Sequence, residues 1–269
     1  MRDFVEDKNS VELVNNVEKS YTVKELFEIL KNINLSEFVK NNTQKWKEYL
    51  NKLIEKDPKV REALIYIISN YKKKRKNNPE KFGWMHCVEA ATLMTEHWFT
   101  NSDEVAAAIL HDVREDIPNG EEYLRSTYNE NTVNLVKSLT EGDKSWYTPE
   151  KEKSSWYERK SEEMGKISKF SPNELALKLA DQISNIAETV NDLENLFPED
   201  RQKYWEWFNA GYDKQIWKYS TLNEIIQKRI QTCKEEQLFQ NEDEEKNLQM
   251  FADSFQWLVN TLKSLMSES

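Results

Sequence analysis

Apolar residues recur along this chain every three or four positions, which is the spacing of one face of an α-helix. One such run covers residues 60–71, and an earlier one has apolar side chains at Leu26, Ile29, Leu30 and Ile33. No stretch alternates apolar and polar residues for long enough to predict a β-sheet. The pattern therefore predicts an all-α protein.

Further helices are expected from residue 84 onward. They cover residues 84–99, 103–115, 130–139, 171–196 and 201–230, the last as one helix or a pair. The helix from 171 opens with Ser171-Pro172-Asn173-Glu174, a capping sequence, and is ended by Pro198. Residues 141–168 predict a long polar loop passing into a helix, and residues 235–269 a final amphipathic helix.

Composition and charge narrow the class of protein. The 269 residues include only 5 Gly and 6 Pro, which fits long helices, and nine Trp argue against a disordered chain. The net charge of −10 makes general nucleic-acid binding unfavourable, but a metal ion and a few local cations could still bind a small anion. No apolar run reaches the ~20 residues of a membrane helix.

Two cysteines, Cys87 and Cys233, are too few for a disulfide framework. A reducing compartment fits this count, and the first residues lack the apolar core of a signal peptide. We therefore expect a cytoplasmic protein with no membrane partner.

Candidate chemistry is concentrated after the apolar run 105–110. His111 and Asp112 place an imidazole and a carboxylate side by side, the nitrogen and oxygen ligands that divalent metals accept. Glu115 and Asp116 follow, and on a continuous helix they share faces with His111 and Asp112 respectively. Carboxylates crowded in this way are costly to bury, and a bound cation would relieve the cost.

A second candidate is Asp181, which lies inside an apolar helical stretch with Lys178 before it and Asn185 one turn later. A buried carboxylate needs a cation or hydrogen-bond donors. His86 alone is more often a structural residue than a ligand, and His97 is assigned to that structural role. The order His86, His111-Asp112, Asp181 is more specific than any one of them.

The basic stretch Lys72-Lys73-Lys74-Arg75-Lys76 has two interpretations. It is a solvated helix end stabilised by the helix dipole, or it contacts the phosphates or base of a ligand. The sequence leaves both open.

The order of these residues resembles the HD superfamily of metal-dependent phosphohydrolases. His111-Asp112-Val113-Arg114-Glu115-Asp116 is similar to the His-Asp-x-x-Glu-Asp motif of the alarmone hydrolases, which include the hydrolase domain of RelA/SpoT proteins. The segment 178–185 is similar to that family's Lys-Leu-Ala-Asp-(Arg/Lys)-x-x-Asn, and segments 139–145 and 204–207 add to the resemblance.

The resemblance implies an HD-domain helical bundle over residues 70–228. Residues 1–69 would form an N-terminal helical extension and residues 229–269 a C-terminal one, and these terminal helices could mediate a homo-oligomer. The part of the chain after Asp181 is too short for the synthetase domain of the long family members. A hydrolase without that domain is therefore implied.

The same resemblance assigns roles at the site. His86, His111, Asp112 and Asp181 would hold one Mn²⁺, while Glu115 and Asp116 would orient a metal-bound water and move its proton. The substrate contacts would come from Asn185, Lys178, Arg75, Lys74 and Lys144. The implied reaction removes the 3′-pyrophosphate of guanosine tetra- or pentaphosphate and leaves GDP or GTP.

The sequence departs from the family pattern at residues near the expected metal ligands, but the ligands themselves match the pattern. Cys87 stands where the family usually has Pro, Gln182 where it has Arg or Lys, and Arg114 where it has an apolar residue. Two alternatives therefore stay open. The chain could hydrolyse another nucleotide, such as an adenosine alarmone, NADPH or a dNTP, or it could be a non-catalytic nucleotide-binding HD module.

Overall fold

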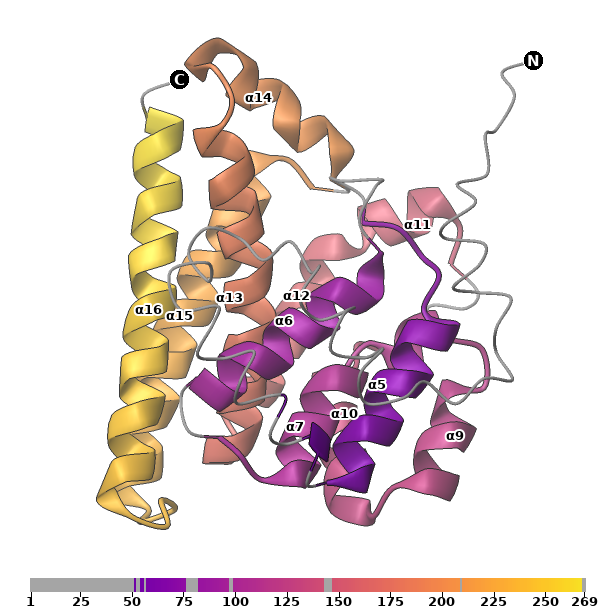
Figure 1. Ribbon diagram of the computed structural model, residues 1–269. Helices are drawn as coiled ribbons and strands as arrows, with labels where there is room; N and C mark the ends of the chain where they lie inside the picture. The colour runs from indigo at the N-terminus through magenta and orange to yellow at the C-terminus, as the bar shows by residue number, and fades with distance from the viewer. Residues whose placement is uncertain are drawn as a thin grey trace, which may run out of the picture.

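The computed structural model describes residues 51, 54–55, 57–75, 82–96, 99–142, 147–208 and 210–267. Within these ranges all regular structure is helical apart from one isolated antiparallel bridge between Lys74 and Phe82. The predicted all-α class is confirmed (Figure 1). The expected helix around residues 26–33, together with His97, Lys76 and Lys144, lies outside the described residues.

The described helices follow one another through short connections. In chain order they are α5 (Pro58–Asn70), α6 (Gly83–Glu96), α7 (Ser102–Leu110), α8 (Val113–Asp116), α9 (Gly120–Thr127), α10 (Glu130–Leu139), α11 (Pro149–Ser154), α12 (Trp156–Ile167), α13 (Pro172–Glu194), α14 (Arg201–Tyr204), α15 (Tyr212–Glu235) and α16 (Glu242–Ser267). Two short 3₁₀ segments, η1 (Pro198–Asp200) and η2 (Trp205–Trp207), flank α14.

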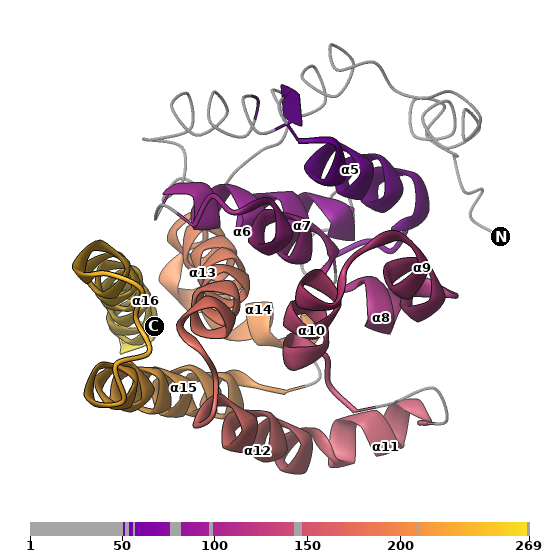
Figure 2. The ribbon, with the colours of Figure 1, turned by 90° about the horizontal axis from the view of Figure 1, so that it is seen from below.

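Helix α13 lies at the centre of the bundle, with α6, α7, α10, α15 and α16 packed around it (Figure 2). Most of its side chains are buried, because neighbours cover it on nearly every side. Its start is the predicted capping box: the Ser171 hydroxyl accepts from the Glu174 N–H, and Glu174 accepts from the Ser171 N–H at 2.8 Å. This helix carries Asp181 into the middle of the protein.

The predicted continuous helix over residues 103–115 is wrong. Helix α7 ends at Leu110, His111 and Asp112 form a turn, and α8 begins at Val113. The His111 ring explains the break, since its Nδ1 lies 2.8 Å from the Ala108 carbonyl. That carbonyl would accept the Asp112 N–H in a continued helix.

Residues 141–168 are predicted as a long loop passing into a helix. The helix is present, but the loop is shorter than expected, because α11 and α12 occupy residues 149–167. Thr148 caps α11 and Pro149 follows it, a normal helix start. Helix α12 buries only Trp156, Met164 and Ile167, so charged residues mask its apolar face in the sequence. The helix predicted at 130–139 is confirmed as α10.

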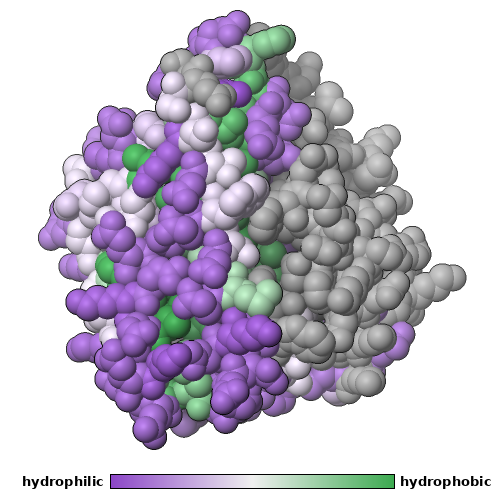
Figure 3. All heavy atoms as spheres, turned by 90° about the vertical axis from the view of Figure 1, so that its left-hand side faces the viewer, coloured by the Kyte–Doolittle hydropathy of each residue, from purple (hydrophilic) through white to green (hydrophobic). Residues whose placement is uncertain are grey.

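The C-terminal helix α16 packs on α13 and α15 through Leu248, Phe251, Phe255 and Leu262. Figure 3 views the molecule from the side of α16, and that face is mostly hydrophilic with scattered apolar side chains. Met250 and Trp257 are about half exposed on α16. No described helix is long and apolar enough to span a membrane. Assembly through the terminal helices and the three-part division of the chain stay predictions.

Candidate metal centre

Three helices bring four of the predicted ligands to one point. His86 comes from α6, His111 and Asp112 follow α7, and Asp181 comes from α13. His86 Nε2 lies 3.2 Å from Asp181 Oδ1, and His111 Nε2 lies 3.3 Å from Asp112 Oδ1 and 3.8 Å from Asp181 Oδ1. Donor atoms bound to one metal at ~2.1 Å lie roughly 3 Å apart, so these spacings suit a shared cation.

The His111 ring shows which of its nitrogens faces this point. Nδ1 donates its proton to the Ala108 carbonyl, so in the neutral ring Nε2 carries a lone pair. Nε2 is buried and has no hydrogen-bond partner among the described residues. Burial lowers the pKa of His111, but the Asp112 and Asp181 carboxylates outweigh it and raise the pKa. A proton or a metal ion on Nε2 would satisfy both carboxylates.

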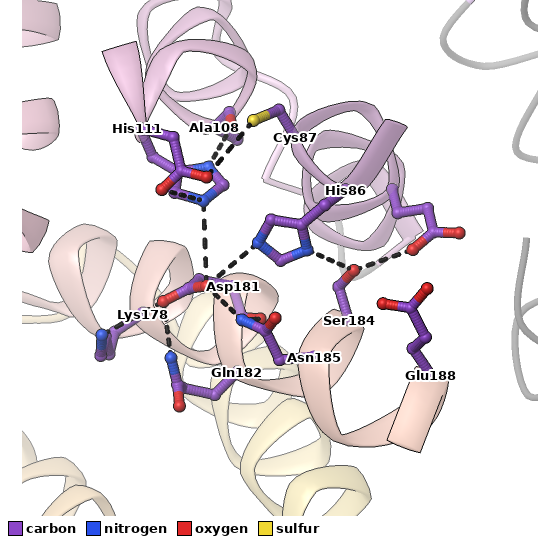
Figure 4. A network of polar contacts seen from close by, with 12 residues as sticks. His86, Cys87, Ala108, His111, Lys178, Asp181, Gln182, Ser184, Asn185 and Glu188 are labelled. Atoms are coloured by element: carbon purple, nitrogen blue, oxygen red, sulfur yellow. Dashed lines mark hydrogen bonds and ion pairs between the residues drawn. The ribbon is translucent and has the colours of Figure 1, made fainter. Parts of the chain in front are cut away.

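His86 is oriented by a hydrogen-bonded chain (Figure 4). Its Nδ1 lies 2.9 Å from the Ser184 hydroxyl, which donates to Glu89 Oε2 at 2.9 Å. Because the Ser184 hydroxyl donates its only proton to Glu89, its oxygen accepts the hydrogen bond from His86 Nδ1. Burial, helped by the charge of Arg75, lowers the pKa of His86. The neutral ring therefore presents the Nε2 lone pair toward Asp181.

Asp181 is held by donors on its own helix. Asn185 Nδ2 donates to Oδ1 at 2.8 Å, while Gln182 Nε2 and Lys178 Nζ contact Oδ2 at 2.6 Å and 3.1 Å. Burial alone would raise the pKa of Asp181, but Lys178 and His86 hold it well below its ordinary range. The carboxylate is therefore ionised, with Oδ1 facing the two imidazoles.

These residues fit a divalent metal ion. His86, His111 and Asp112 offer ligand atoms within 4.8 Å of one another, and Asp181 Oδ1 lies 3.2 Å and 3.8 Å from the two imidazole Nε2 atoms. The buried His111 Nε2 has no hydrogen-bond partner among the residues that the structure describes. Such a mixed nitrogen and oxygen set is typical of Mn²⁺, Fe²⁺ and Zn²⁺ sites. The predicted ligand set stays a prediction, and its convergence in space supports it.

A cavity of about 260 Å³ opens beside the ligands. It is lined by Tyr71, Lys73, Lys74, Arg75, Gly83, His86, Asp112, Asp116, Asp181, Asn185 and Phe208. Cations from the basic stretch and carboxylates from the His-Asp segment therefore face the same space. This arrangement suits an anionic ligand held next to a metal ion.

The comparison with known families agrees with this geometry. A family model described as HD domain matches residues 63–204, more than half of the chain. The chain belongs to the HD domain family. The resemblance inferred from the order His86, His111-Asp112, Asp181 is thereby confirmed.

Individual relatives of this HD domain are also recognisable. The chain is 28% identical to guanosine-3′,5′-bis(diphosphate) 3′-pyrophosphohydrolase MESH1 of Drosophila melanogaster over 158 residues. The aligned region covers 58% of this chain and 83% of the relative. A solved structure of a metazoan SpoT ortholog that hydrolyses ppGpp is 22% identical, with a TM-score of 0.48 over 72% of this chain and 94% of that one. A second solved structure, lmo0812 of Listeria monocytogenes EGD-e, is 23% identical, with a TM-score of 0.47 over 65% of this chain and 94% of that one.

The basic stretch of this HD domain does not continue α5, which ends at Asn70. Lys73 Nζ lies 2.5 Å from Asp116 Oδ1, and Lys74 Nζ lies 3.2 Å from the centre of the Phe82 ring. Arg75 donates to Asn185 Oδ1 and Glu188 Oε2, both at 2.8 Å. Lys73, Lys74 and Arg75 line the cavity, which favours the ligand-contact interpretation over the helix-end one.

The remaining predicted residues of the HD domain differ in their access to the cavity. Asp116 lines it, whereas Glu115 is exposed and its Oε1 accepts from the Glu141 N–H at 2.7 Å. Asn185 lines the cavity, whereas Lys178 is buried between Glu163 and Asp181. Contact between Lys178 and a substrate stays a prediction.

Sequence reasoning missed the residues that orient the ligands. Ser184 and Glu89 fix the tautomer of His86, and Gln182 holds Asp181. The only available signal was spacing, because Glu89 lies three residues after His86 and Ser184 three residues after Asp181. On a helix such neighbours share a face with the ligand.

Proposed function

We propose that this protein is a metal-dependent phosphohydrolase that removes the 3′-pyrophosphate of guanosine tetra- and pentaphosphate. The observation that carries the proposal is that the Nε2 atoms of His86 and His111 face the carboxylates of Asp112 and Asp181 beside a cation-lined cavity. The substrate rests on the 28% identity to the Drosophila 3′-pyrophosphohydrolase over 158 residues. The products are GDP or GTP and pyrophosphate.

His86, His111, Asp112 and Asp181 hold the metal, for which we propose Mn²⁺. When bound, such an ion lowers the pKa of a coordinated water and polarises a phosphoryl oxygen. The protein's part is to direct Nε2 of each imidazole toward the ion. The Ala108 carbonyl does this for His111 and the Ser184 hydroxyl does it for His86, because each accepts the Nδ1 proton.

Asp116 is the carboxylate best placed to accept a proton from the attacking water. It lines the cavity next to Asp112, and its Oδ1 is held by Lys73 at 2.5 Å. Glu115 lies one residue earlier, and its hydrogen bond from the Glu141 N–H fixes its side chain beside the loop after α10. We assign proton transfer to Asp116 and orientation of the polar surroundings to Glu115.

The substrate enters the cavity with its phosphates toward Lys73, Lys74 and Arg75. Lys73 and Lys74 are exposed at the cavity, with Lys73 paired to Asp116 and Lys74 over the Phe82 ring, whereas Arg75 is half-buried and anchored on Glu188. Phe208 offers an aromatic surface on the same cavity against which a base can pack. Asn185 presents its amide beside Asp181 and can contact the ribose or the 3′-pyrophosphate.

The test is product analysis. Purified protein with Mn²⁺ and guanosine tetraphosphate should yield GDP and pyrophosphate on anion-exchange chromatography, and EDTA should abolish both products. Asp112→Ala should be inactive, while Asp253→Asn on the outer face of α16 serves as a matched acidic control. Transfer of a single phosphate, or product formation unaffected by EDTA, would contradict the proposal.

The alternative substrates are part of the same experiment. Adenosine alarmones, NADPH and dNTPs are incubated in parallel under identical metal concentrations. Faster turnover of one of these would replace the guanosine assignment while keeping the hydrolase. Metal binding without turnover of any nucleotide would instead favour the non-catalytic module.

A further inference from the structure

Tyr71 lies at the end of α5 and reaches the candidate metal centre from outside the ligand set. Its hydroxyl is 2.5 Å from Asp116 Oδ2 and 3.1 Å from Asp112 Oδ2. The residue is only 5% exposed, so most of its phenol ring is buried. Tyr71 therefore touches both carboxylates of the His-Asp segment at once.

The ring of Tyr71 lies directly on Gly83, the first residue of α6. A Cβ added to Gly83 would come within 2.4 Å of Tyr71 Cζ and within 2.8 Å of both neighbouring ring carbons. Any other residue at position 83 would displace the ring. Gly83 is held in place by its N–H, which donates to the Lys73 carbonyl at 2.8 Å. The glycine thus provides the space in which the phenol ring packs.

We infer that Tyr71 is a positioning residue, packed on Gly83, whose hydroxyl orients Asp116 for proton transfer. This inference rests on the proposed function and adds a residue to it. Asp116 is held at both oxygens, by Lys73 at Oδ1 and by Tyr71 at Oδ2. Two fixed contacts leave the carboxylate little freedom to rotate.

The second contact of the hydroxyl separates the two carboxylates. Asp112 Oδ1 faces His111, and Asp112 Oδ2 faces the Tyr71 hydroxyl. A hydroxyl placed between two carboxylates gives its proton to the nearer one, here Asp116, and its dipole reduces their repulsion. Tyr71 therefore acts through Asp116 and does not need to touch the substrate.

Tyr71→Phe tests this role, because it keeps the ring on Gly83 and removes only the hydroxyl. In wild type it should lower kcat about 10–100-fold, with KM and the Mn²⁺ dissociation constant changed less than about threefold. In an Asp116→Ala background the same change should alter kcat less than about twofold, since the acceptor of the Tyr71 hydroxyl is already lost. Tyr66→Phe, on the same helix but stacked on Tyr123, is the matched control.

A parallel cycle does not depend on turnover. The urea midpoint of unfolding should fall with Tyr71→Phe in wild type and stay nearly constant in the Asp116→Ala background. Gly83→Ala should reduce kcat at least as much as Tyr71→Phe, because it displaces the ring.

The outcomes separate the inference from the function. Equal effects of Tyr71→Phe in both backgrounds, or an unchanged kcat, would overturn the positioning role. If wild type hydrolysed no nucleotide, the proposed function would fail. The urea measurements alone would then test the coupling of Tyr71 to Asp116. An equal fall of the midpoint on Tyr71→Phe in both backgrounds would refute that coupling.

Discussion

His86 Nδ1 lies 2.9 Å from the Ser184 hydroxyl, and this contact determines which nitrogen of the ring faces the other ligands. Both residues are buried, on α6 and α13 respectively. The hydroxyl in turn donates to Glu89, so His86 Nδ1 must donate its proton to the hydroxyl oxygen. A proposed metal ligand in this HD domain is thus oriented by a residue outside the proposed ligand set.

Ser184→Ala should weaken Mn²⁺ binding about 10–100-fold, because His86 loses the partner that fixes its tautomer and ring orientation. Isothermal titration of the metal-free protein measures this directly. Ser254→Ala, an exposed serine that bonds only to its own helix on α16, is the control. Unchanged metal affinity in Ser184→Ala would show that the ring is oriented without the serine.

Removing a ligand should abolish metal binding and activity together. His111→Ala and Asp112→Ala each take away one donor of a converging set, so the remaining donors can no longer bind one ion tightly. Bound manganese after gel filtration, measured by mass spectrometry, should fall from about one per chain to near zero. Full occupancy with lost activity would place the metal elsewhere.

Asp116→Asn should keep the metal and lower kcat about 10²–10⁴-fold, because the amide cannot accept the proton of the attacking water. Glu115→Gln should likewise keep the metal and lose turnover. Comparing the two measures how proton transfer divides between them. Full activity in Glu115→Gln would remove it from the mechanism and leave Asp116 as the base.

Glu104→Gln should stabilise the protein at alkaline pH. Burial, with Glu244 and Asp103 nearby, raises the pKa of Glu104 from its ordinary 4.5 to about 7. The folded state therefore holds its proton more tightly than the unfolded chain does. The free energy of unfolding falls as pH rises from about 4.5 to about 7. At higher pH the folded protein carries the full cost of burying the ionised Glu104 carboxylate.

The glutamine variant carries no such penalty. Its free energy of unfolding in urea should exceed that of wild type by about 1–3 kcal/mol at pH 8 and match it near pH 4. Glu122→Gln on the exposed side of α9 is the control. Equal stability of Glu104→Gln and wild type at pH 8 would mean that Glu104 ionises freely in the fold.

Ser171→Ala should cost about 0.5–2 kcal/mol of stability, because the first turn of α13 loses its capping hydroxyl. The kcat should stay within about twofold of wild type, since Asp181 lies ten residues further along a well-packed helix. Urea unfolding and the product assay test the two parts. A large loss of activity would show that the cap, and not the packing of α13, sets the position of Asp181.

The sequence predicted which residues come together at the candidate site, because each lies in an apolar helical context that marks it as buried. His86, His111, Asp112 and Asp181 meet where three helices converge, and only their order hinted at that meeting. The start of α13 was predictable because Ser171 and Glu174 form a local motif. Motifs of this kind involve residues close together in the chain, so they can be recognised from the sequence alone.

Other features depend on contacts that no local pattern encodes. The break between α7 and α8 arises from the His111 ring bonding to the Ala108 carbonyl, which periodicity does not report. The starts of α11 and α12 were not predicted, because ion pairs let charged residues of α12 lie close to the core, as Glu163 does with Lys178. Tyr71 carries no motif, and its role follows from the distant Gly83 and Asp116.

The most direct test of the account is a crystal structure of the protein soaked in Mn²⁺, read through anomalous scattering at the manganese edge. The account predicts one strong peak within bonding distance of His86 Nε2, His111 Nε2, Asp112 and Asp181. An enzyme that is active with Mn²⁺ but shows no peak among these four residues, or shows its strongest peak elsewhere, would contradict it.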